Sequence, residues 1–274
     1  MPEVVECEIQ VDGLKKLEGL EITKVEFRDG GEVVTRPHDK ETFDEILVGR
    51  IISKINRIGK YIVFHLNGVY MTSHLAMTGR WFIGKEETPH TRVLIHLKGE
   101  FWNNYTLQYI DVRKFGRIRL EDDLNDKKYD KKYGDVLFKR AEELERIIKL
   151  NKHKVDKWNV KELLTNQKLL VGIGNVYANE ILSHACIHPA KPVKNLTENQ
   201  RFHLTKAIEI VLYNGYKYGG LSLKDYFHVD GSKGEMQKHL NVYQKKECTF
   251  CKGEIETTTV LDKRKTFYCP NCQK

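Results

Sequence analysis

Four cysteines near the end of the chain most strongly limit what this sequence can fold into. They form two C-x2-C pairs separated by seventeen residues, at Cys248, Cys251, Cys269 and Cys272. Each pair supplies two thiolates, and a hairpin-length separation lets both pairs converge on one tetrahedral zinc ion. The alternative, two disulfides, is disfavoured because residues 1–20 lack the basic start and apolar stretch of a secretory signal.

The segment that carries these cysteines is too short to bury a core of its own, so we expect a metal to hold it together. A site with four protein ligands has no open position for chemistry, and the expected cofactor is therefore one structural Zn²⁺. Residues 231–274 carry nine Lys and Arg against five Asp and Glu, including three consecutive cations in LDKRKTFY at 261–268. A rigid basic hairpin suits contact with DNA phosphates. The other cysteines, Cys7 and Cys186, are expected to be small buried hydrophobes.

Length and composition indicate a soluble globular protein. The 274 residues suit about two domains plus an appendage. No apolar run approaches the roughly 20 residues needed to span a bilayer, so we expect no membrane association and take the cytoplasm as the default location. The net charge is +8, and the basic stretches KINRIGK at 54–60 and DVRKFGRIR at 111–119 suit a phosphate backbone. Ordinary solvated surface charge is the alternative.

Strand patterns dominate residues 20–120. Short alternating or β-branched and aromatic runs occur at ITKVEF, YIVFHL, VYMTSHL, RVLIHL, LQYIDV and GRIRL. They predict an antiparallel sandwich or barrel-like domain. The charged stretch at 121–135 has no apolar periodicity and is expected to link domains.

Helical periodicity follows from about residue 136 to residue 218. We expect helices in LFKRAEELERIIKL, NVKELLTNQKLL, NVYANEILSHA and TENQRFHLTKAIEIVLYNGYKY. The last begins with Thr197 and Gln200 in capping-box spacing. The Gly-rich polar stretch at 219–235 is expected to be a mobile, functional loop.

A glycine turn joins two of these helical stretches. Gly172-Ile173-Gly174 precedes Asn175, which opens the second helix of the pair. Glycine permits close approach of another backbone, and a helix start offers unpaired N–H groups to an anion, so a DNA phosphate could bind there. A structural turn between packed helices is the alternative.

The string GIGNVYANEIL resembles the helix-two-turn-helix signature of the formamidopyrimidine-DNA glycosylase and endonuclease VIII family. Similar motifs run in the family's order along nearly the whole chain: PEVVE at 2–6, RIGKYIVF at 57–64, SHLAMTGR at 73–80, YIDVRKFG at 109–116, the 219–235 loop and CTFC…TFYCPNCQ. The resemblance implies an α+β multidomain fold: an N-terminal antiparallel β-sandwich with a leading helix, a helix-two-turn-helix domain and a C-terminal zinc-ribbon β-hairpin. We place the domains at 1–130, 131–237 (with a lesion-recognition loop at 219–235) and 238–274.

The resemblance also implies chemistry at the chain start. Met1 would be removed, leaving Pro2 with a free secondary amine. A terminal amine has a pKa of about 7.7–8.0 against about 10.4 for lysine, so about a tenth of it is uncharged at pH 7. Attack on the anomeric carbon displaces the damaged base and leaves an iminium of the Schiff-base type. Elimination at the acidified neighbouring position would then break the strand. The resemblance therefore implies a base-excision repair glycosylase and AP lyase acting by β,δ-elimination.

Further site residues follow from the same resemblance. Glu3 would carry protons beside the amine. Glu6 would support Glu3 without touching the substrate, or would orient the first helix. For both residues, a favourable interaction with the helix dipole is the alternative. Phosphate contacts are expected from three separate modules. They are Lys60 in the hairpin, Asn175 at the glycine turn and Arg264 in the zinc hairpin. Lys161 and His90 resemble residues that touch DNA near the lesion, although a surface cation and a strand-end histidine explain them equally well.

Base removal requires the nucleotide to leave the stack, and the remaining hole must be filled. Met77, Arg113 and Phe115 resemble the family's void-filling triad of apolar wedge, planar cation and stacking ring. Plain core packing is the alternative for Met77 and Phe115. The spacing of Arg113 and Phe115 puts both on one side of an extended segment.

DVRKFG and the 219–235 segment favour the purine branch of the family, hence 8-oxoguanine and formamidopyrimidines in duplex DNA, with abasic sites as further substrates. An endonuclease VIII-like enzyme for oxidised pyrimidines, or a non-catalytic protein that binds damaged DNA, are the other two hypotheses. Val5, Thr78 and Lys265 depart from the family pattern, and Thr78 is expected near the base pocket. We expect a monomer, associated with the nucleoid through its DNA binding.

Overall fold

The structure is a computed structural model and describes residues 2–99, 104–124, 142–222, 226–259 and 264–274. The chain forms two compact units. The first comprises residues 1–2, 6–130 and 219–235, and the second comprises residues 3–5, 131–218 and 236–274. None of the helices in these ranges is long and apolar enough to span a lipid bilayer.

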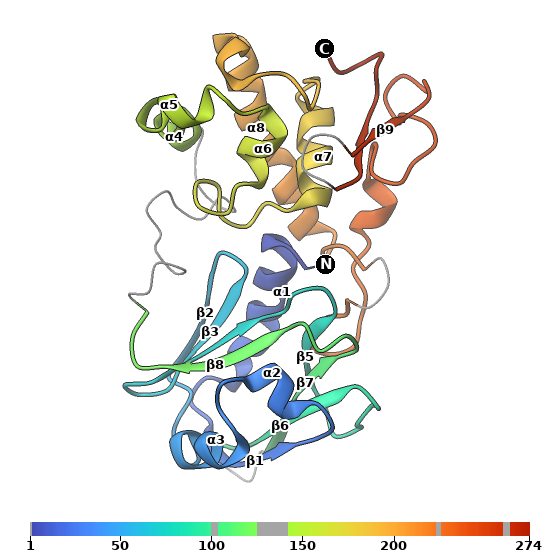
Figure 1. The fold of residues 1–274 in the computed structure, drawn as a ribbon. Helices are drawn as coiled ribbons and strands as arrows, with labels where there is room; N and C mark the ends of the chain where they lie inside the picture. Colours follow the sequence, from blue (N-terminus) through green and yellow to red (C-terminus); the bar gives the residue numbers. More distant parts are fainter. Residues whose placement is uncertain (1, 100–103, 125–141, 223–225, 260–263) are drawn as a thin grey trace. The chain divides into compact units, whose positions relative to one another are not determined.

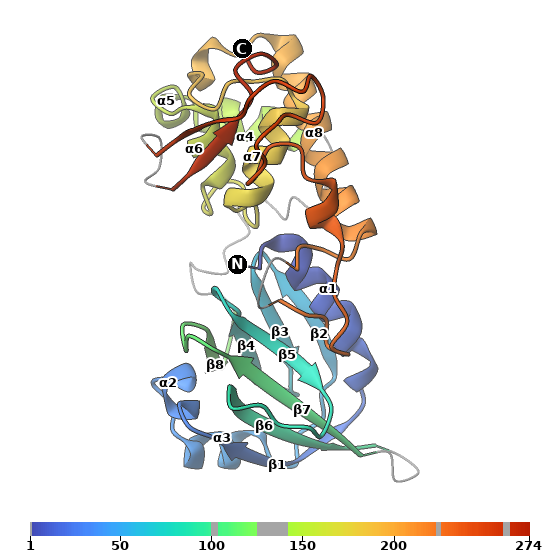
Figure 2. The same cartoon turned by 90° about the vertical axis from the view of Figure 1, so that its right-hand side faces the viewer.

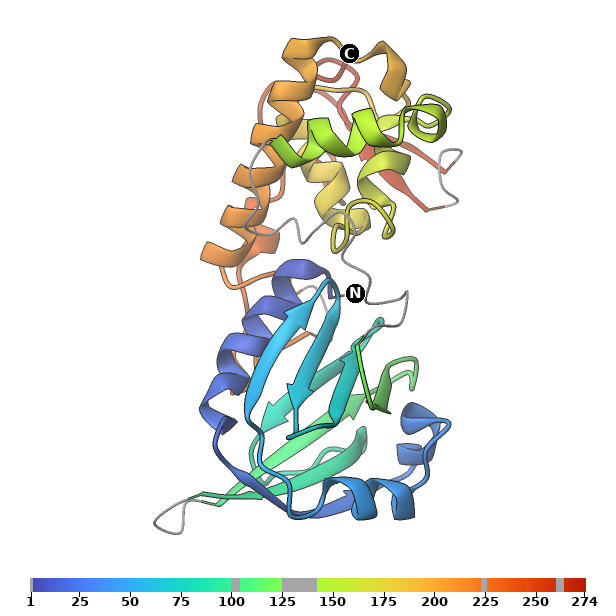
Figure 3. The same cartoon turned by 90° about the vertical axis from the view of Figure 1, so that its left-hand side faces the viewer.

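Two four-stranded antiparallel sheets form the first unit (Figures 1 and 3). One has the strand order β1-β6-β7-β5 and the other β2-β3-β4-β8. The strands are β1 (Glu21–Phe27), β2 (Lys54–Ile58), β3 (Tyr61–His65), β4 (Tyr70–His74), β5 (Gly79–Ile83), β6 (Thr91–Lys98), β7 (Asn104–Asp111) and β8 (Arg117–Glu121). The expected antiparallel sandwich is confirmed.

The core of the first unit lies between the two sheets. Its largest buried side chains include Trp81 and Tyr109 from one sheet and Phe64 from the other. Trp81 meets both rings edge to face, with centroids 5.3 Å from Phe64 and 5.0 Å from Tyr109. Side chains that alternate inward along each strand thus meet across the sandwich, as the period-two pattern requires.

Three helices accompany this sandwich: α1 (Val4–Leu14), α2 (Gly31–Thr35) and α3 (Lys40–Leu47), with the 3₁₀ turn η1 (Lys15–Leu17) after α1. The expected leading helix is α1, and Figure 3 shows it beside β2 and β3. The sequence patterns do not predict α2 and α3, which are short. Asp39 caps α3 by accepting the backbone N–H of Thr42 at 2.9 Å.

The helices of the second unit are α4 (Glu142–Leu150), α5 (Lys152–Val155), α6 (Val160–Thr165), α7 (Asn175–His184) and α8 (Glu198–Lys217), with 3₁₀ turns η3 (Val193–Asn195) and η4 (Met236–His239). The predicted capping box between Thr197 and Gln200 is present at the start of α8. The pattern at 159–170 overestimates α6, because the chain turns at Asn166, whose side chain accepts the N–H of Lys168 at 3.0 Å. Of the expected helix at 137–150, residues 137–141 lie outside the described residues.

The four-cysteine segment carries a small antiparallel hairpin of β9 (Glu256–Thr258) and β10 (Thr266–Tyr268). Figure 2 shows this hairpin beside α7. The Asn179 side chain on α7 accepts the backbone N–H of Phe267 at 2.9 Å. Glu180, also on α7 and buried, accepts the N–H groups of residues 241–243 at 2.6–3.1 Å.

The two compact units differ from the expected domain boundaries in two respects. Residues 236–274 belong to the same compact unit as the helices, because α7 supplies the partners for their backbone. The segment 219–235, expected with the helical domain, clusters with the first unit instead. The reason is its packing on α1 and β5: the Val229 carbonyl accepts the N–H of Ile83 at 2.7 Å.

Candidate active site and nucleic-acid interface

The carboxylate of Glu3 caps the start of α7. Its oxygens accept the backbone N–H groups of Gly174 at 2.6 Å, Val176 at 2.9 Å and Tyr177 at 3.4 Å. The side chain is only 1 % exposed. A negative charge at a helix N-terminus is favoured by the helix dipole and by the unpaired N–H groups of the first turn.

This contact occupies the position where we expected a DNA phosphate to bind at the glycine turn. The N–H groups proposed for a DNA phosphate already hold a carboxylate of the same chain. A Cβ at Gly174 would collide with the Glu3 carboxyl group, and one at Gly172 would meet the Val4 side chain at 2.6 Å. The glycines therefore admit residues 3–5, and the turn is a receptor for the chain start.

Pro2 is buried, and Met1 lies outside the described residues. In the first unit, the Glu6 carboxylate accepts the N–H of Leu221 at 2.8 Å, and the Glu6 carbonyl accepts the hydroxyl of Tyr226 at 2.9 Å. Burial, with a smaller contribution from Glu6, raises the pKa of Tyr226 well above its ordinary value. Glu6 thus fastens the segment 219–235 to α1.

The described parts of that segment are anchored, which differs from the mobile loop expected over its whole length. Gln10 on α1 donates to the Phe227 carbonyl at 2.9 Å and accepts the N–H of Trp81 at 2.9 Å. The guanidinium of Arg80 lies 4.3 Å from the centre of the Phe227 ring. Leu221, Tyr226 and Val229 are buried. Residues 223–225 lie outside the described residues.

Lys60 lies in the turn between β2 and β3, and two contacts fix this turn to α1. Arg57 donates to Glu8 at 2.6 Å and to the Gly59 carbonyl at 2.9 Å. The thiol of Cys7 lies 3.5 Å from the Lys60 carbonyl oxygen, and burial raises the pKa of this thiol to about 12. Lys60 is therefore carried by a hairpin that is fixed to α1, the helix that follows Pro2. Cys7 is buried, as expected.

Next to this turn, His74 packs its ring on Tyr61 with centroids 4.9 Å apart. Burial, with a smaller contribution from Lys60, lowers the pKa of His74 to about 4. The imidazole is therefore neutral at neutral pH and adds no positive charge beside Lys60.

The three proposed void-filling residues come together at one edge of the sandwich. Met77 is 43 % exposed and Phe115 is 50 % exposed. The Arg113 guanidinium donates to the Met77 sulfur at 3.2 Å and stacks over the Phe115 ring at 4.7 Å. Core packing is thus excluded for Met77 and Phe115, and the three side chains form a single exposed group suited to entering a base stack.

Asn175 and Arg264 belong to the second unit. The Asn175 amide donates to the carbonyl of Lys265 at 3.1 Å, which places the helix start next to the residue that follows Arg264. Lys265 lies with its ammonium 5.3 Å from the Phe267 ring centre. The glycine turn and the hairpin of β9 and β10 therefore present their polar groups together. Residues 260–263, part of the expected basic loop, lie outside the described residues.

Lys161 does not occupy the DNA-facing position expected for it. Its side chain is 0 % exposed, and its ammonium donates to the Thr266 hydroxyl on β10. A fully buried cation cannot contact a phosphate, so in this structure Lys161 joins α6 to the hairpin of β9 and β10.

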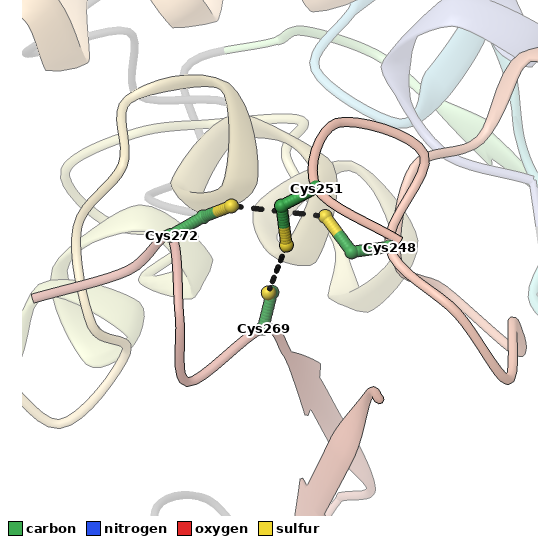
Figure 4. A group of neighbouring side chains, drawn as sticks. All are labelled: Cys248, Cys251, Cys269 and Cys272. Carbon is green, nitrogen blue, oxygen red and sulfur yellow. Dashed lines mark hydrogen bonds between the residues drawn. The ribbon is translucent and has the colours of Figure 1, made fainter. Parts of the chain in front are cut away.

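Figure 4 shows the four cysteine side chains of the tail pointing toward one another. Their sulfur atoms all lie within 4.8 Å of each other, with Cys248–Cys272 at 3.9 Å and Cys251–Cys269 at 3.5 Å. Four thiolates at about 2.3 Å from one tetrahedral ion would be about 3.8 Å apart. The N–H of Gly253 donates to the Cys251 sulfur at 3.4 Å. The cluster fits one metal ion.

Cys186 is exposed, so the expectation of a buried hydrophobe is wrong for this cysteine. It follows the end of α7 with a positive φ of 55°, and its carbonyl accepts the N–H of Lys274 at 3.2 Å. The left-handed turn that ends the helix directs the side chain outward.

Comparison with known proteins gives the same architecture. Residues 1–118 match the formamidopyrimidine-DNA glycosylase N-terminal domain, and residues 139–226 match the formamidopyrimidine-DNA glycosylase H2TH domain. A formamidopyrimidine-DNA glycosylase of Brevibacillus brevis is 36 % identical over 100 % of this chain and 99 % of its own. The chain belongs to the formamidopyrimidine-DNA glycosylase family.

Solved structures of the Lactococcus lactis glycosylase are similar along the whole chain. A mutant of that enzyme in complex with Fapy-dG-containing DNA is 32 % identical, with a TM-score of 0.85 and full coverage of both chains. A complex with DNA containing an abasic site has a TM-score of 0.83 at 31 % identity and 99 % coverage of both. A third, with DNA containing an oxidised pyrimidine, has a TM-score of 0.84 at 31 % identity and full coverage.

Within this glycosylase fold, sequence reasoning missed the residues that hold the site in place. Asp111, which is 0 % exposed, accepts N–H and O–H groups around the Met77 and Arg113 loops. Gln10 and Glu180 connect segments more than sixty residues apart. The only local signal was the position of Asp111 at the head of DVRKFG, since such long-range partners leave no periodic trace in a sequence.

Proposed function

We propose that the protein is a bifunctional enzyme of base-excision repair: a glycosylase that removes oxidised purines from duplex DNA, and an AP lyase that nicks the strand at the resulting site. The observation that carries the proposal is the placement of Glu3. This carboxylate, one peptide bond from Pro2, is buried and held by three N–H groups of the helix-two-turn-helix. The family's signature motif thus positions the chain start.

The nucleophile is the amine of Pro2 after removal of Met1. Its lone pair attacks C1′ of the damaged nucleotide, the glycosidic bond breaks, and the base leaves with the bonding electrons and a proton. Opening of the sugar ring gives an iminium between the Pro2 nitrogen and C1′. The iminium acidifies C2′, and loss of a C2′ proton expels the 3′ phosphate, followed by the 5′ phosphate in the second elimination.

Glu3 moves protons beside this amine, and the braced turn at Lys60 offers its cation to the phosphate next to the lesion. Asn175 and Arg264 bind the backbone of the same strand from the second unit. Arg113, Met77 and Phe115 fill the hole left by the everted nucleotide, and His90, exposed and adjacent to Asp111, contacts DNA near it. Lys161 has no place among these DNA contacts, because it is buried.

The metal of the four-cysteine cluster is one Zn²⁺. It supplies no chemistry and holds the hairpin that carries Arg264. The sulfur spacing and the short length of this module support zinc. We further propose that the protein acts as a monomer on duplex DNA that contains damaged bases or abasic sites.

Borohydride trapping tests the chemistry, because reduction converts only an iminium into a permanent protein–DNA adduct. Protein shown by intact mass to begin at Pro2 is incubated with duplexes that contain 8-oxoguanine or an abasic site. We expect a covalent adduct with both, and none with Pro2→Glu, whose larger second residue retains Met1. Lack of an adduct with the wild-type protein would overturn the enzyme proposal and leave a protein that binds damaged DNA without turnover.

A second candidate substrate class is oxidised pyrimidines, favoured by the Lactococcus lactis complex with DNA that contains such a lesion. Single-turnover base release from matched duplexes with 8-oxoguanine or an oxidised pyrimidine separates the two. Faster release of 8-oxoguanine supports the purine assignment, and the reverse order supports the pyrimidine one.

A further inference from the structure

Two neighbouring loops of the first unit carry the exposed group formed by Met77, Arg113 and Phe115. One loop, residues 75–78, joins β4 to β5, and the other, residues 112–116, joins β7 to β8. Each loop crosses from one sheet of the sandwich to the other. The strands at their ends are paired, with Gly79 opposite Asp111 in one sheet and His74 opposite Arg117 in the other.

Strand pairing fixes the ends of these loops but leaves their tips to other contacts. Ala76 and Lys114 have positive φ values of 51° and 56°, a conformation that costs free energy in non-glycine residues unless surrounding contacts impose it. The backbone at the tips is therefore held by side chains.

The side chains that hold it are Thr78 and Asp111. The Thr78 hydroxyl donates to Asp111 Oδ1 at 2.5 Å and accepts the N–H of Arg113 at 3.1 Å. Asp111 Oδ1 also lies 3.2 Å from the Arg113 nitrogen, and Asp111 Oδ2 accepts the N–H of Gly116 at 2.7 Å. The Asp111 carboxylate and the Thr78 hydroxyl thus hold both ends of the Arg113–Gly116 segment. The hydrogen bond between them joins this segment to the loop that carries Met77.

Both side chains are shielded from solvent, with Thr78 6 % and Asp111 0 % exposed. Charge-assisted hydrogen bonds in such an environment are strong and directional. We infer that Thr78 and Asp111 are positioning residues, which hold the two loops in register so that Met77, Arg113 and Phe115 enter the DNA stack as one group. This inference rests on the proposed function, and it assigns Thr78 a place behind the void-filling loops in place of the base pocket.

The neighbouring Tyr109 offers a matched control. Its hydroxyl lies against the backbone of Gly79 and Gly116, because a Cβ on either glycine would collide with it. Within the described part of the chain this buried oxygen has no hydrogen-bond partner. Tyr109→Phe therefore alters the same spot without removing a bond between the loops.

The test compares Thr78→Val, Thr78→Ser, Tyr109→Phe, Met77→Ala and the double variant M77A/T78V. Single-turnover rates are measured for base release from an 8-oxoguanine duplex and for strand cleavage at an abasic site, where no base has to leave the stack. We expect Thr78→Val to slow base release about tenfold and abasic cleavage less than about twofold. Thr78→Ser and Tyr109→Phe should retain the wild-type rates.

Because Thr78 acts through the wedge, M77A/T78V should release the base about as slowly as Met77→Ala alone. Equal slowing of both substrates by Thr78→Val, or fully additive losses in the double variant, would overturn the inference. Absence of base release by the wild-type protein would instead contradict the proposed function. Amide exchange then decides the inference alone: Thr78→Val should speed exchange at Arg113 and Gly116 at least about tenfold, and unchanged exchange would refute it.

Discussion

The Glu3 Oε2 atom lies 2.6 Å from the backbone nitrogen of Gly174, although 171 positions separate the two residues in the chain. The helix-two-turn-helix therefore binds the chain start as it would bind an anion. This makes the conformation of residues 3–5 depend on the integrity of a motif whose sequence lies far away.

Substitution Glu3→Gln should destabilise the second unit. The amide nitrogen of glutamine cannot accept a hydrogen bond, so at least one buried N–H group at the start of α7 loses its partner, at a cost of about 1–3 kcal/mol. Urea unfolding measures this change, with the exposed Glu41→Gln as control. A change in the free energy of unfolding no larger than that of Glu41→Gln would contradict the capping role.

Removal of the metal should disorganise the hairpin and weaken DNA binding. Elemental analysis should find about one zinc per chain, since four thiolates form one closed site. A chelator, or Cys251→Ser, should lower the melting temperature and abolish binding to an abasic-site duplex. Cys186→Ser, at the exposed cysteine outside the cluster, should bind like the wild type. Full DNA affinity without metal would exclude a structural zinc.

Lys161→Met should lower stability but leave the salt dependence of DNA binding unchanged. A lysine that neutralises a phosphate contributes about 0.9 to the slope of log K against log salt concentration. A lysine buried against Thr266 contributes nothing to that slope. Lys265→Met, at an exposed cation of the zinc hairpin, is the comparison. A slope reduced by about one in Lys161→Met would restore the DNA contact first expected.

Acid should destabilise the first unit through His74. Its pKa is about 4 in the folded protein, mainly because of burial, against about 6.5 when unfolded. The unfolded chain therefore binds the proton first, and stability falls as the pH drops from about 6.5 to about 4. Between pH 7 and pH 5 the loss is at most about 2 kcal/mol. Between pH 7 and pH 5, His74→Phe should lose less free energy of unfolding than the wild type, as measured by urea unfolding. The control His203→Gln should lose as much as the wild type. An identical loss in His74→Phe would assign the acid sensitivity to other groups.

Much of this architecture could be predicted, because its signals are local. The cysteine spacing indicated a closed metal site, the alternating runs indicated the sandwich, and DVRKFG brought Arg113 and Phe115 to one side of a segment that the structure shows exposed. Short elements with polar outward faces, such as β2 and α3, have patterns too brief to recognise. Neither could a sequence show that Glu3 would take the anion position at the glycine turn.

The burial of Lys161 and the exposure of Cys186 were missed for a related reason. Residue type gives only an average tendency. The partner that buries Lys161, Thr266, lies more than eighty positions away, and Cys186 is exposed by the left-handed turn that follows α7. The proximity of such residues is a property of the folded chain.

The contacts from α7 have a consequence for protein engineering. Asn175, Asn179 and Glu180 each bind backbone of the segment 241–267, so the cysteine tail has no complete set of partners without that helix. A transplant of the tail onto another scaffold would have to include α7. A redesigned tail without metal would still need this helix to hold its backbone.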